Sequence, residues 1–144
     1  MNKIIKYFLL FIIGGILYVF LEILWRGYTH SSMFVVGGIS FLIVGSLNES
    51  FEYNMSLPLQ VLIGTSCITL IEFVSGIILN IWLKLNIWDY SNLKGNILGQ
   101  ICPQFILIWA LLSLVCIILD DYLRYWFWNE PKPQYYFRSD KHDK

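Results

Sequence analysis

The stretch Leu57–Leu83 reads LPLQVLIGTSCITLIEFVSGIILNIWL. It is long enough to cross a bilayer as one helix, which takes roughly 20 apolar residues. Its only charged residue, Glu72, lies close to the middle of the stretch. A carboxylate in hydrocarbon has no water to solvate it, and on insertion scales it costs about 2.5–3.5 kcal/mol at the centre of a helix. The stretch therefore predicts a membrane-spanning helix that carries a functional acid.

The composition of the whole chain supports a membrane location. Of its 144 residues, 57% are hydrophobic and only 14% are charged, and a soluble domain of this size has no interior large enough for so much apolar surface. Ten Phe, nine Tyr and six Trp suit a chain with two membrane–water interfaces. The formal net charge is zero, which argues against a nucleic-acid partner. We therefore expect one domain surrounded by the lipid bilayer.

Three further apolar stretches predict an all-α, polytopic membrane protein with four transmembrane helices. The expected spans are about 4–24, 33–48, 57–83 and 97–124 in a single domain of residues 1–130, followed by a polar, disordered cytoplasmic tail at 131–144. The second span is short for a bilayer, so a re-entrant segment is the alternative there. The first span begins with basic residues like a signal peptide, but no small-x-small cleavage site follows it. We expect it to be retained as a helix.

The distribution of Lys and Arg predicts the orientation of the four spans. An even number of spans places both termini on one side, which then carries seven Lys and Arg residues: Lys3, Lys6, Arg124, Lys132, Arg138, Lys141 and Lys144. The other side carries three, namely Arg26, Lys84 and Lys94. Cytoplasmic segments carry the excess of positive charge in membrane proteins. Both termini are therefore expected in the cytoplasm, with the chain in the bacterial cytoplasmic membrane.

Polar and small residues inside the spans follow helical spacing. Residues three, four and seven apart share one face of a helix, and on the third span these are Thr65, Thr69, Glu72, Gly76 and Asn80. The other spans have matching stripes, and because lipid-facing polar groups are costly, all four stripes are expected to point inward. For the small residues and hydroxyls, close helix packing explains the pattern without a ligand. For Glu72 the cost of burial favours a binding site. The stripes of the other spans are Gly15, Tyr18, Glu22 and Arg26; Gly38, Gly45 and Glu49; and Ser113, Cys116, Asp120 and Arg124.

Two groups of charged residues lie near the ends of spans. Glu22 and Arg26 are four residues apart and can form an ion pair on their own helix. The sequence leaves open whether this pair is structural or functional. Asp120 and Asp121 precede Arg124 among Tyr and Trp residues, a pattern that is typical of an anchor at the membrane interface.

The segment between the third and fourth spans mixes aromatic and amide side chains. Trp88–Asn92 reads WDYSN, and further amides follow it. Asp, Asn and Ser side chains build tight turns, and the same groups can bind the polar head of a ligand. Convergent polar groups in an apolar, aromatic-lined cavity are the usual form of a small-molecule site. The candidate ligand-binding residues, all on the side opposite the termini, are Glu22, Arg26, Glu72, Asn80, Asp89, Tyr90, Asn96 and Gln100.

The two halves of the chain echo one another. Phe20–Glu22 reads FLE and Leu70–Glu72 reads LIE, each followed by Trp, Tyr and Ser before a glycine-bearing return helix. Both return helices end in acids, at Asn48–Glu49 and at Asp120–Asp121. The pattern indicates two parallel helical-hairpin repeats, an arrangement found in some transporters.

Several of these motifs together resemble a known bacterial family, the ABC-transporter permeases of type IV, which are small multi-span membrane proteins. The resemblance covers roughly residues 16–124, nearly the whole membrane part. One departure is Pro103–Gln104, where the family would place an apolar residue beside the proline. The resemblance implies a transporter component of unspecified substrate. Its motifs are WRGY at Trp25–Tyr28, EF at Glu72–Phe73, WDYSN at Trp88–Asn92, GQIC at Gly99–Cys102 and DDYLR at Asp120–Arg124.

The sequence also bears on which partner chains the resemblance implies. An ABC permease is coupled to an ATPase, but the chain has no GxxxxGK[ST] phosphate-binding motif. Any ATPase is therefore expected to be a separate chain. Four spans are also few for a translocation path, so a homo-oligomer is the other expectation.

The alternative function is a lipid- or isoprenoid-binding membrane protein, or a membrane enzyme in which Glu72 or Asp89 acts as general acid or base. No span contains His, and no nucleophile motif is present. The three Cys show no metal-ligand spacing and are expected to be small buried hydrophobes. We therefore predict no catalytic residue, no metal site and no cofactor.

Overall fold

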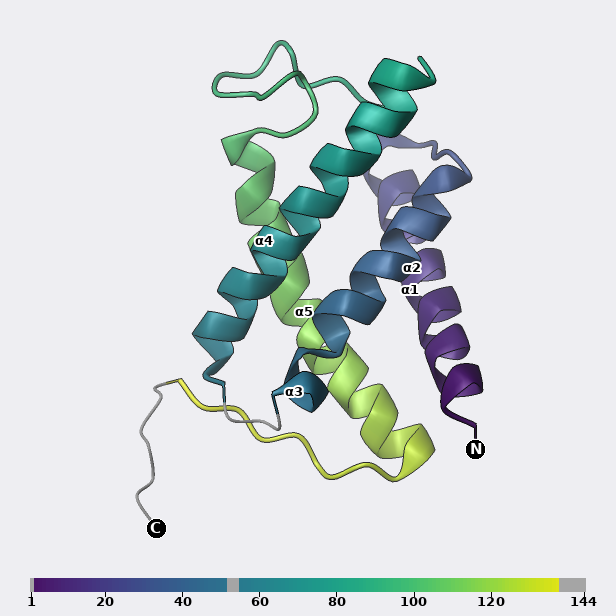
Figure 1. The fold of residues 1–144 in the computed structure, drawn as a ribbon, viewed down its shortest axis with the longest axis vertical. Helices are drawn as coiled ribbons and strands as arrows, with labels where there is room; N and C mark the ends of the chain where they lie inside the picture. The colour runs from purple at the N-terminus through teal and green to yellow at the C-terminus, as the bar shows by residue number, and fades with distance from the viewer. Residues whose placement is uncertain (1, 52–54, 138–144) are drawn as a thin grey trace.

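The chain folds into a helical bundle, shown in Figure 1. The computed structural model describes residues 2–51 and 55–137. Its elements are α1 (Lys3–Arg26), α2 (Ser32–Gly45), α3 (Leu47–Ser50), α4 (Leu57–Gly76), the π-helix η1 (Ile77–Trp82) and α5 (Pro103–Trp128). Four helical stretches are long and apolar enough to cross a membrane: Lys3–Arg26, Ser32–Ser50, Leu57–Trp82 and Pro103–Trp128. The predicted all-α fold with four spans is confirmed.

The bundle has two ends, each formed by different segments of the chain. The terminal end consists of the start of α1, α3, the start of α4 and residues 129–137, which lie together in Figure 1. The loop end holds residues 27–31 and the long connection 83–102. α2 and the short α3 lead from the loop end to the terminal end. This path favours a complete crossing over the re-entrant alternative for the second span.

Glycines set the close contact between α1 and α2. A Cβ atom on Gly14 would lie 2.2 Å from the Phe41 Cβ, and one on Gly37 would lie 2.3 Å from the Tyr18 Cβ. Side chains larger than hydrogen are excluded at both positions, so the two backbones approach closely, as in other membrane helix pairs. α2 also packs against α4 and α5, and α4 packs against α5. The second helix is therefore the centre of the bundle.

The polar stripes point inward as predicted. Thr65 and Glu72 on α4, and Ser113, Asp120 and Arg124 on α5, are all buried. Large apolar side chains instead lie exposed on the outer surface, which suits contact with lipid rather than water. Examples are Phe8, Phe20 and Leu24 on α1, Leu62 and Leu70 on α4, and Leu107 and Leu111 on α5.

The fourth span begins six residues later than expected, at Pro103, and ends at Trp128 rather than near residue 124. Residues 97–101 form a tight turn instead, closed by the bridge between Ile97 and Ile101. Leu98 and Gly99 both have positive φ angles, 53° and 70°, which a right-handed helix cannot contain. Pro103 then takes the first-turn position, where its missing N–H costs nothing.

The segment after α5 folds back across the terminal end. Asn129 ends α5 in the left-handed conformation with φ of 54°. Further along, the Tyr136 carbonyl accepts a 2.6 Å hydrogen bond from the Leu57 N–H at the start of α4, and Pro133 is buried. Residues 131–137 of the expected tail thus contact the bundle, and residues 138–144 lie outside the described part.

Candidate functional site

Glu72 lies buried between helices at the loop end, with 7% of its surface exposed. Its Oε1 accepts a 2.9 Å hydrogen bond from the Tyr90 hydroxyl. Its Oε2 is also buried and has no hydrogen-bond partner among the described residues. A buried oxygen without a donor costs about 1–3 kcal/mol, and more when charged. Glu72 therefore has an acceptor position open for a proton, a cation or a donor group.

Aromatic rings surround this carboxyl group. Tyr18 from α1 and Trp109 from α5 lie close enough to interact with Glu72, and their rings stack with centroids 6.5 Å apart. Phe105 stacks on Tyr90 at 4.6 Å and lies 6.2 Å from Trp109. Burial and the Glu72 carboxylate raise the pKa of Tyr90 far above its ordinary value. The phenol therefore stays protonated and remains a hydrogen-bond donor.

The amides predicted as ligand groups bond to one another instead. Asn80 Nδ2 donates to Gln100 Oε1 at 2.8 Å, and Asn80 Oδ1 accepts from the Ile87 N–H at 2.8 Å. Gln100 Nε2 donates to the Leu98 carbonyl, while the Trp88 indole donates to the Gln100 carbonyl. The π-helix η1 places Asn80 in this network, a use of π-turns that is frequent near functional sites. Asn80 and Gln100 therefore hold the loop over Glu72.

The Glu22–Arg26 ion pair forms as expected and reaches beyond its own helix. Arg26 Nη2 donates to Glu22 Oε1 at 2.9 Å, and Nη1 donates to the Ile87 carbonyl at 2.8 Å. The Thr29 hydroxyl donates to the other Glu22 oxygen. The pair thus ties the end of α1 to the long connection. Arg26 Nε is buried and has no partner among the described residues.

Asp89 and Asn96 lie apart from Glu72, within the turn of the long connection. Asp89 is exposed, and its Oδ1 accepts from the Ser91 N–H at 2.9 Å. The hydrogen bonds from Ser91 hold the pKa of Asp89 below its ordinary value. Asn96 Oδ1 accepts from the Gly99 N–H, and its amide donates to the Leu93 carbonyl at 2.8 Å. Both side chains shape the turn, and the structure does not bring them to the buried acid.

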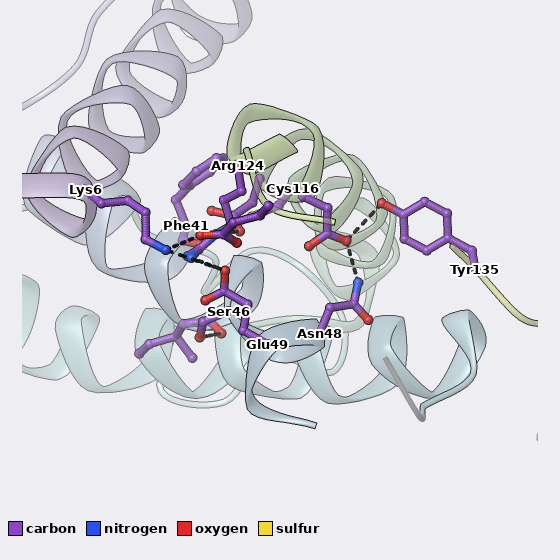
Figure 2. Close-up of polar contacts among 12 residues, drawn as sticks. Lys6, Phe41, Ser46, Asn48, Glu49, Cys116, Arg124 and Tyr135 are labelled. Atoms are coloured by element: carbon purple, nitrogen blue, oxygen red, sulfur yellow. Dashed lines mark hydrogen bonds and ion pairs between the residues drawn. The ribbon is translucent and has the colours of Figure 1, made fainter. Parts of the chain in front are cut away.

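A second polar cluster, at the terminal end, was not among the predicted sites (Figure 2). Arg124 is fully buried, donates from Nε to Asp120 at 2.6 Å and pairs through Nη1 with Glu49. Lys6 pairs with Glu130 and lies 4.0 Å from Glu49. The cluster joins α1, α3, α5 and the segment after α5. The interpretation of Asp120, Asp121 and Arg124 as an interfacial anchor is wrong, because all three are buried inside the bundle.

Asp121 occupies a distinct place in this cluster, with 1% of its surface exposed. Its Oδ2 accepts hydrogen bonds from the Asn48 amide and, at 2.9 Å, from the Tyr135 hydroxyl. Its Oδ1 is buried with no partner among the described residues. The sequence signal for this site was the pair of acidic helix ends, Asn48–Glu49 and Asp120–Asp121.

An apolar crevice of about 100 Å³ is bounded by α1, α2 and α5 with one contribution from α4. Tyr18 and Trp109, which flank Glu72, line it together with Phe41. It also includes Cys116 and Leu119, which lie four residues and one residue before Asp120 on α5. The crevice therefore lies between the two buried carboxyl sites.

Comparison with known proteins agrees with this architecture. The model of the family described as "Putative ABC-transporter type IV" matches residues 8–133. Comparison with curated proteins and with solved structures gave no match. The family match covers most of the chain, including nearly all of the four spans, Glu72 and the connection between the third and fourth spans, so the chain belongs to this family.

Proposed function

We propose that this member of the ABC-transporter type IV family is a transporter component whose intramembrane carboxyl group, Glu72, binds a proton or another small cation during transport. The observation that carries the proposal is the buried, partnerless Oε2 of Glu72 in a membrane-spanning helix. Intramembrane acids are costly and mark ion and proton pathways in transporters. Tyr18 and Trp109 connect this acid to the apolar crevice.

The roles of the other predicted residues follow from their contacts. Asn80, Tyr90 and Gln100 hold the cover of the site, and Glu22 with Arg26 fixes the α1 side of that cover. Asp89 and Asn96 maintain the turn itself. Ligand binding therefore centres on Glu72, with the surrounding residues positioning it.

Orientation in the membrane follows from the seven-to-three excess of Lys and Arg on the terminal side. We place the termini in the cytoplasm of a bacterial cell and Glu72 toward the outer leaflet. Reporter fusions after Lys144 and beside Ser31 test this. Cytoplasmic activity at Lys144 and external activity at Ser31 are expected, and the reverse pattern would move the Glu72 site to the inner leaflet.

Partner chains complete the proposed transporter. The long apolar faces of α1 and α5 leave room for further helices in the membrane, and a separate ATPase would bind at the cytoplasmic terminal end. Four spans are few for a translocation path, so we propose that copies of the chain assemble into a homo-oligomer that encloses it.

The crevice favours a second candidate function, the binding of a lipid or isoprenoid chain. Its lining is almost wholly apolar and comes from helices that are long and apolar enough to cross a membrane. Native mass spectrometry of the purified chain separates the two candidates. A lipid that copurifies in equal amounts with wild type and Glu72→Gln would favour the lipid-binding function.

Proton movement into liposomes tests the main proposal. The purified chain is reconstituted with an internal pH-sensitive dye, and proton uptake is followed after a pH gradient is imposed. We expect uptake with wild type, its loss in Glu72→Gln, and normal uptake in Asp89→Asn, a matched acid-to-amide change at an exposed position. Equal uptake by wild type and Glu72→Gln would contradict the role of Glu72.

A further inference from the structure

We propose that Asp121 is a second proton-binding residue, in a site at the terminal end formed with Asn48 and Tyr135. This site is separate from Glu72 and does not depend on the role proposed for that residue. It rests on three observations: the balance of charges in the cluster, the hydrogen bonds of Asp121, and the burial of its free oxygen.

The charges of the terminal-end cluster do not balance. Two cations, Lys6 and Arg124, face four carboxyl groups, which belong to Glu49, Asp120, Asp121 and Glu130. Arg124 pairs with Asp120 and Glu49, while Lys6 pairs with Glu130. Glu49 and Glu130 also share a hydrogen bond, which requires one proton between them and leaves Asp121 as the remaining carboxyl group without a cation. No Lys, Arg or His of the described residues forms an ion pair with Asp121. Buried charges without a counter-ion are strongly disfavoured in a low-dielectric interior.

The hydrogen bonds of Asp121 leave one position vacant for a proton. Asn48 and Tyr135 both donate to Oδ2, and both are neutral groups. Oδ1 receives no donor from the described residues, although it is buried. A proton on Oδ1 removes the net charge and converts a partnerless acceptor into a hydroxyl. The two donors remain on Oδ2 and hold the carboxyl group in place.

The groups around Asp121 come from every element packed against it. α3 contributes Asn48, and the segment after α5 contributes Tyr135. Lys6, Glu49 and Glu130 interact with one another and with Arg124 in the adjoining part of the cluster. Neighbours on α5 itself are Cys116, Asp120 and Arg124. The described residues contain no group of three or more His, Cys, Asp or Glu that could hold a metal ion. The single vacant oxygen of Asp121, beside two neutral donors, is the place for a proton.

Glu72 and Asp121 share one arrangement at opposite ends of the bundle. In each, a Tyr hydroxyl donates at 2.9 Å to one carboxyl oxygen while the other oxygen is buried without a partner. The crevice lies between them. Relays of buried acids carry protons through pumps and transporters, so a second acceptor near the cytoplasmic side suits such a path.

Infrared spectroscopy of the purified full chain in lipid nanodiscs detects protonated carboxyl groups directly by their C=O stretch. We expect Asp121→Asn to remove one such pH-dependent band that Glu72→Gln and Asp89→Asn both retain. An unchanged set of bands in Asp121→Asn would overturn the proposal. If Glu72→Gln removes no band, only the function proposed above is contradicted, because the Asp121 band is assigned separately.

Tyr135→Phe provides a milder test that does not remove the acid. The Tyr135 hydroxyl donates to the Oδ2 of Asp121, so its loss should move the C=O band of the protonated Asp121 to higher frequency. Tyr90→Phe is the matched control and should leave that band unmoved. If Asp121→Asn does not fold, an unshifted band in Tyr135→Phe would by itself overturn the proposal.

Discussion

The two ends of the bundle each bury an acid beneath a tyrosine hydroxyl, but they are held together by different interactions. At the loop end, neutral amides close the structure through Asn80 and Gln100. At the terminal end, ion pairs of Arg124 and Lys6 connect three elements and the segment after α5. Neutral hydrogen bonds are modest and local, whereas a buried ion pair becomes costly when one partner is lost. The terminal end should therefore be the more sensitive to mutation.

Arg124→Gln should have the largest effect on stability. It leaves Asp120, which is fully buried, without its cation and removes the partner of Glu49. Breaking one side of a buried ion pair typically costs about 3–5 kcal/mol. Thermal unfolding in detergent should show a strongly lowered Tm, and the double variant Arg124→Gln/Asp120→Asn should recover part of the loss. An unchanged Tm in Arg124→Gln would mean that the ion pairs of Arg124 do not stabilise the terminal end.

Asn80→Leu should have an intermediate effect, confined to the loop end. It leaves the Gln100 Oε1 and the Ile87 N–H without their partners, and each buried partnerless group costs about 1–3 kcal/mol. Hydrogen exchange should accelerate in residues 83–102 and stay unchanged around Arg124. Faster exchange throughout the bundle would contradict the separation of the two ends.

The difference between the ends also explains what could be predicted from the sequence. The four spans and the burial of Glu72 follow from local patterns, namely apolar length and helical spacing. The contacts of Asp121 do not, because Asn48 is 73 residues away in the chain. Tyr135 lies in a stretch whose polar composition predicts a disordered tail rather than a packed segment. The sequence shows the acidic ends of the two return helices, at Asn48–Glu49 and Asp120–Asp121. Only the folded structure shows that these two ends are in contact.

At the loop end, the sequence instead predicts ligand-binding residues that the structure shows in a turn. The sequence predicts Asp89 and Asn96 as ligand-binding residues because turn-forming side chains and ligand-binding side chains are the same residue types. In the structure they bond to the backbone of their own turn. The late start of α5 has the same origin, since the positive φ angles at Leu98 and Gly99 are invisible to hydropathy.

Arg26→Gln should have a smaller effect than either change above, although it removes an ion pair as Arg124→Gln does. The Arg26 and Glu22 side chains retain 20% and 15% exposure, and pairs in contact with solvent are worth about 1 kcal/mol or less. The Tm should fall slightly and should recover little in Arg26→Gln/Glu22→Gln. A loss as large as that of Arg124→Gln would show that ion pairs support both ends equally.

Asp89→Asn should have the smallest effect, because Asp89 is exposed and interacts mainly with Ser91. Its pKa is below the ordinary value in the folded chain, so any stability it contributes is present above the unfolded pKa and is lost as pH falls through the folded pKa. The wild type and the variant should thus have the same Tm below that pH. Between pH 6 and 8 we expect only a marginally lower Tm in the variant.

A double-mutant cycle with Glu72 completes this comparison. Since Asp89 bonds within its own turn and Glu72 bonds to Tyr90, the effects of Asp89→Asn and Glu72→Gln on the free energy of unfolding should add within about 0.5 kcal/mol. Strong non-additivity would show that the exposed turn and the buried acid act as one site. The loop end would then be a coupled network like the terminal end. The contrast between neutral hydrogen bonds at the loop end and ion pairs at the terminal end would no longer hold.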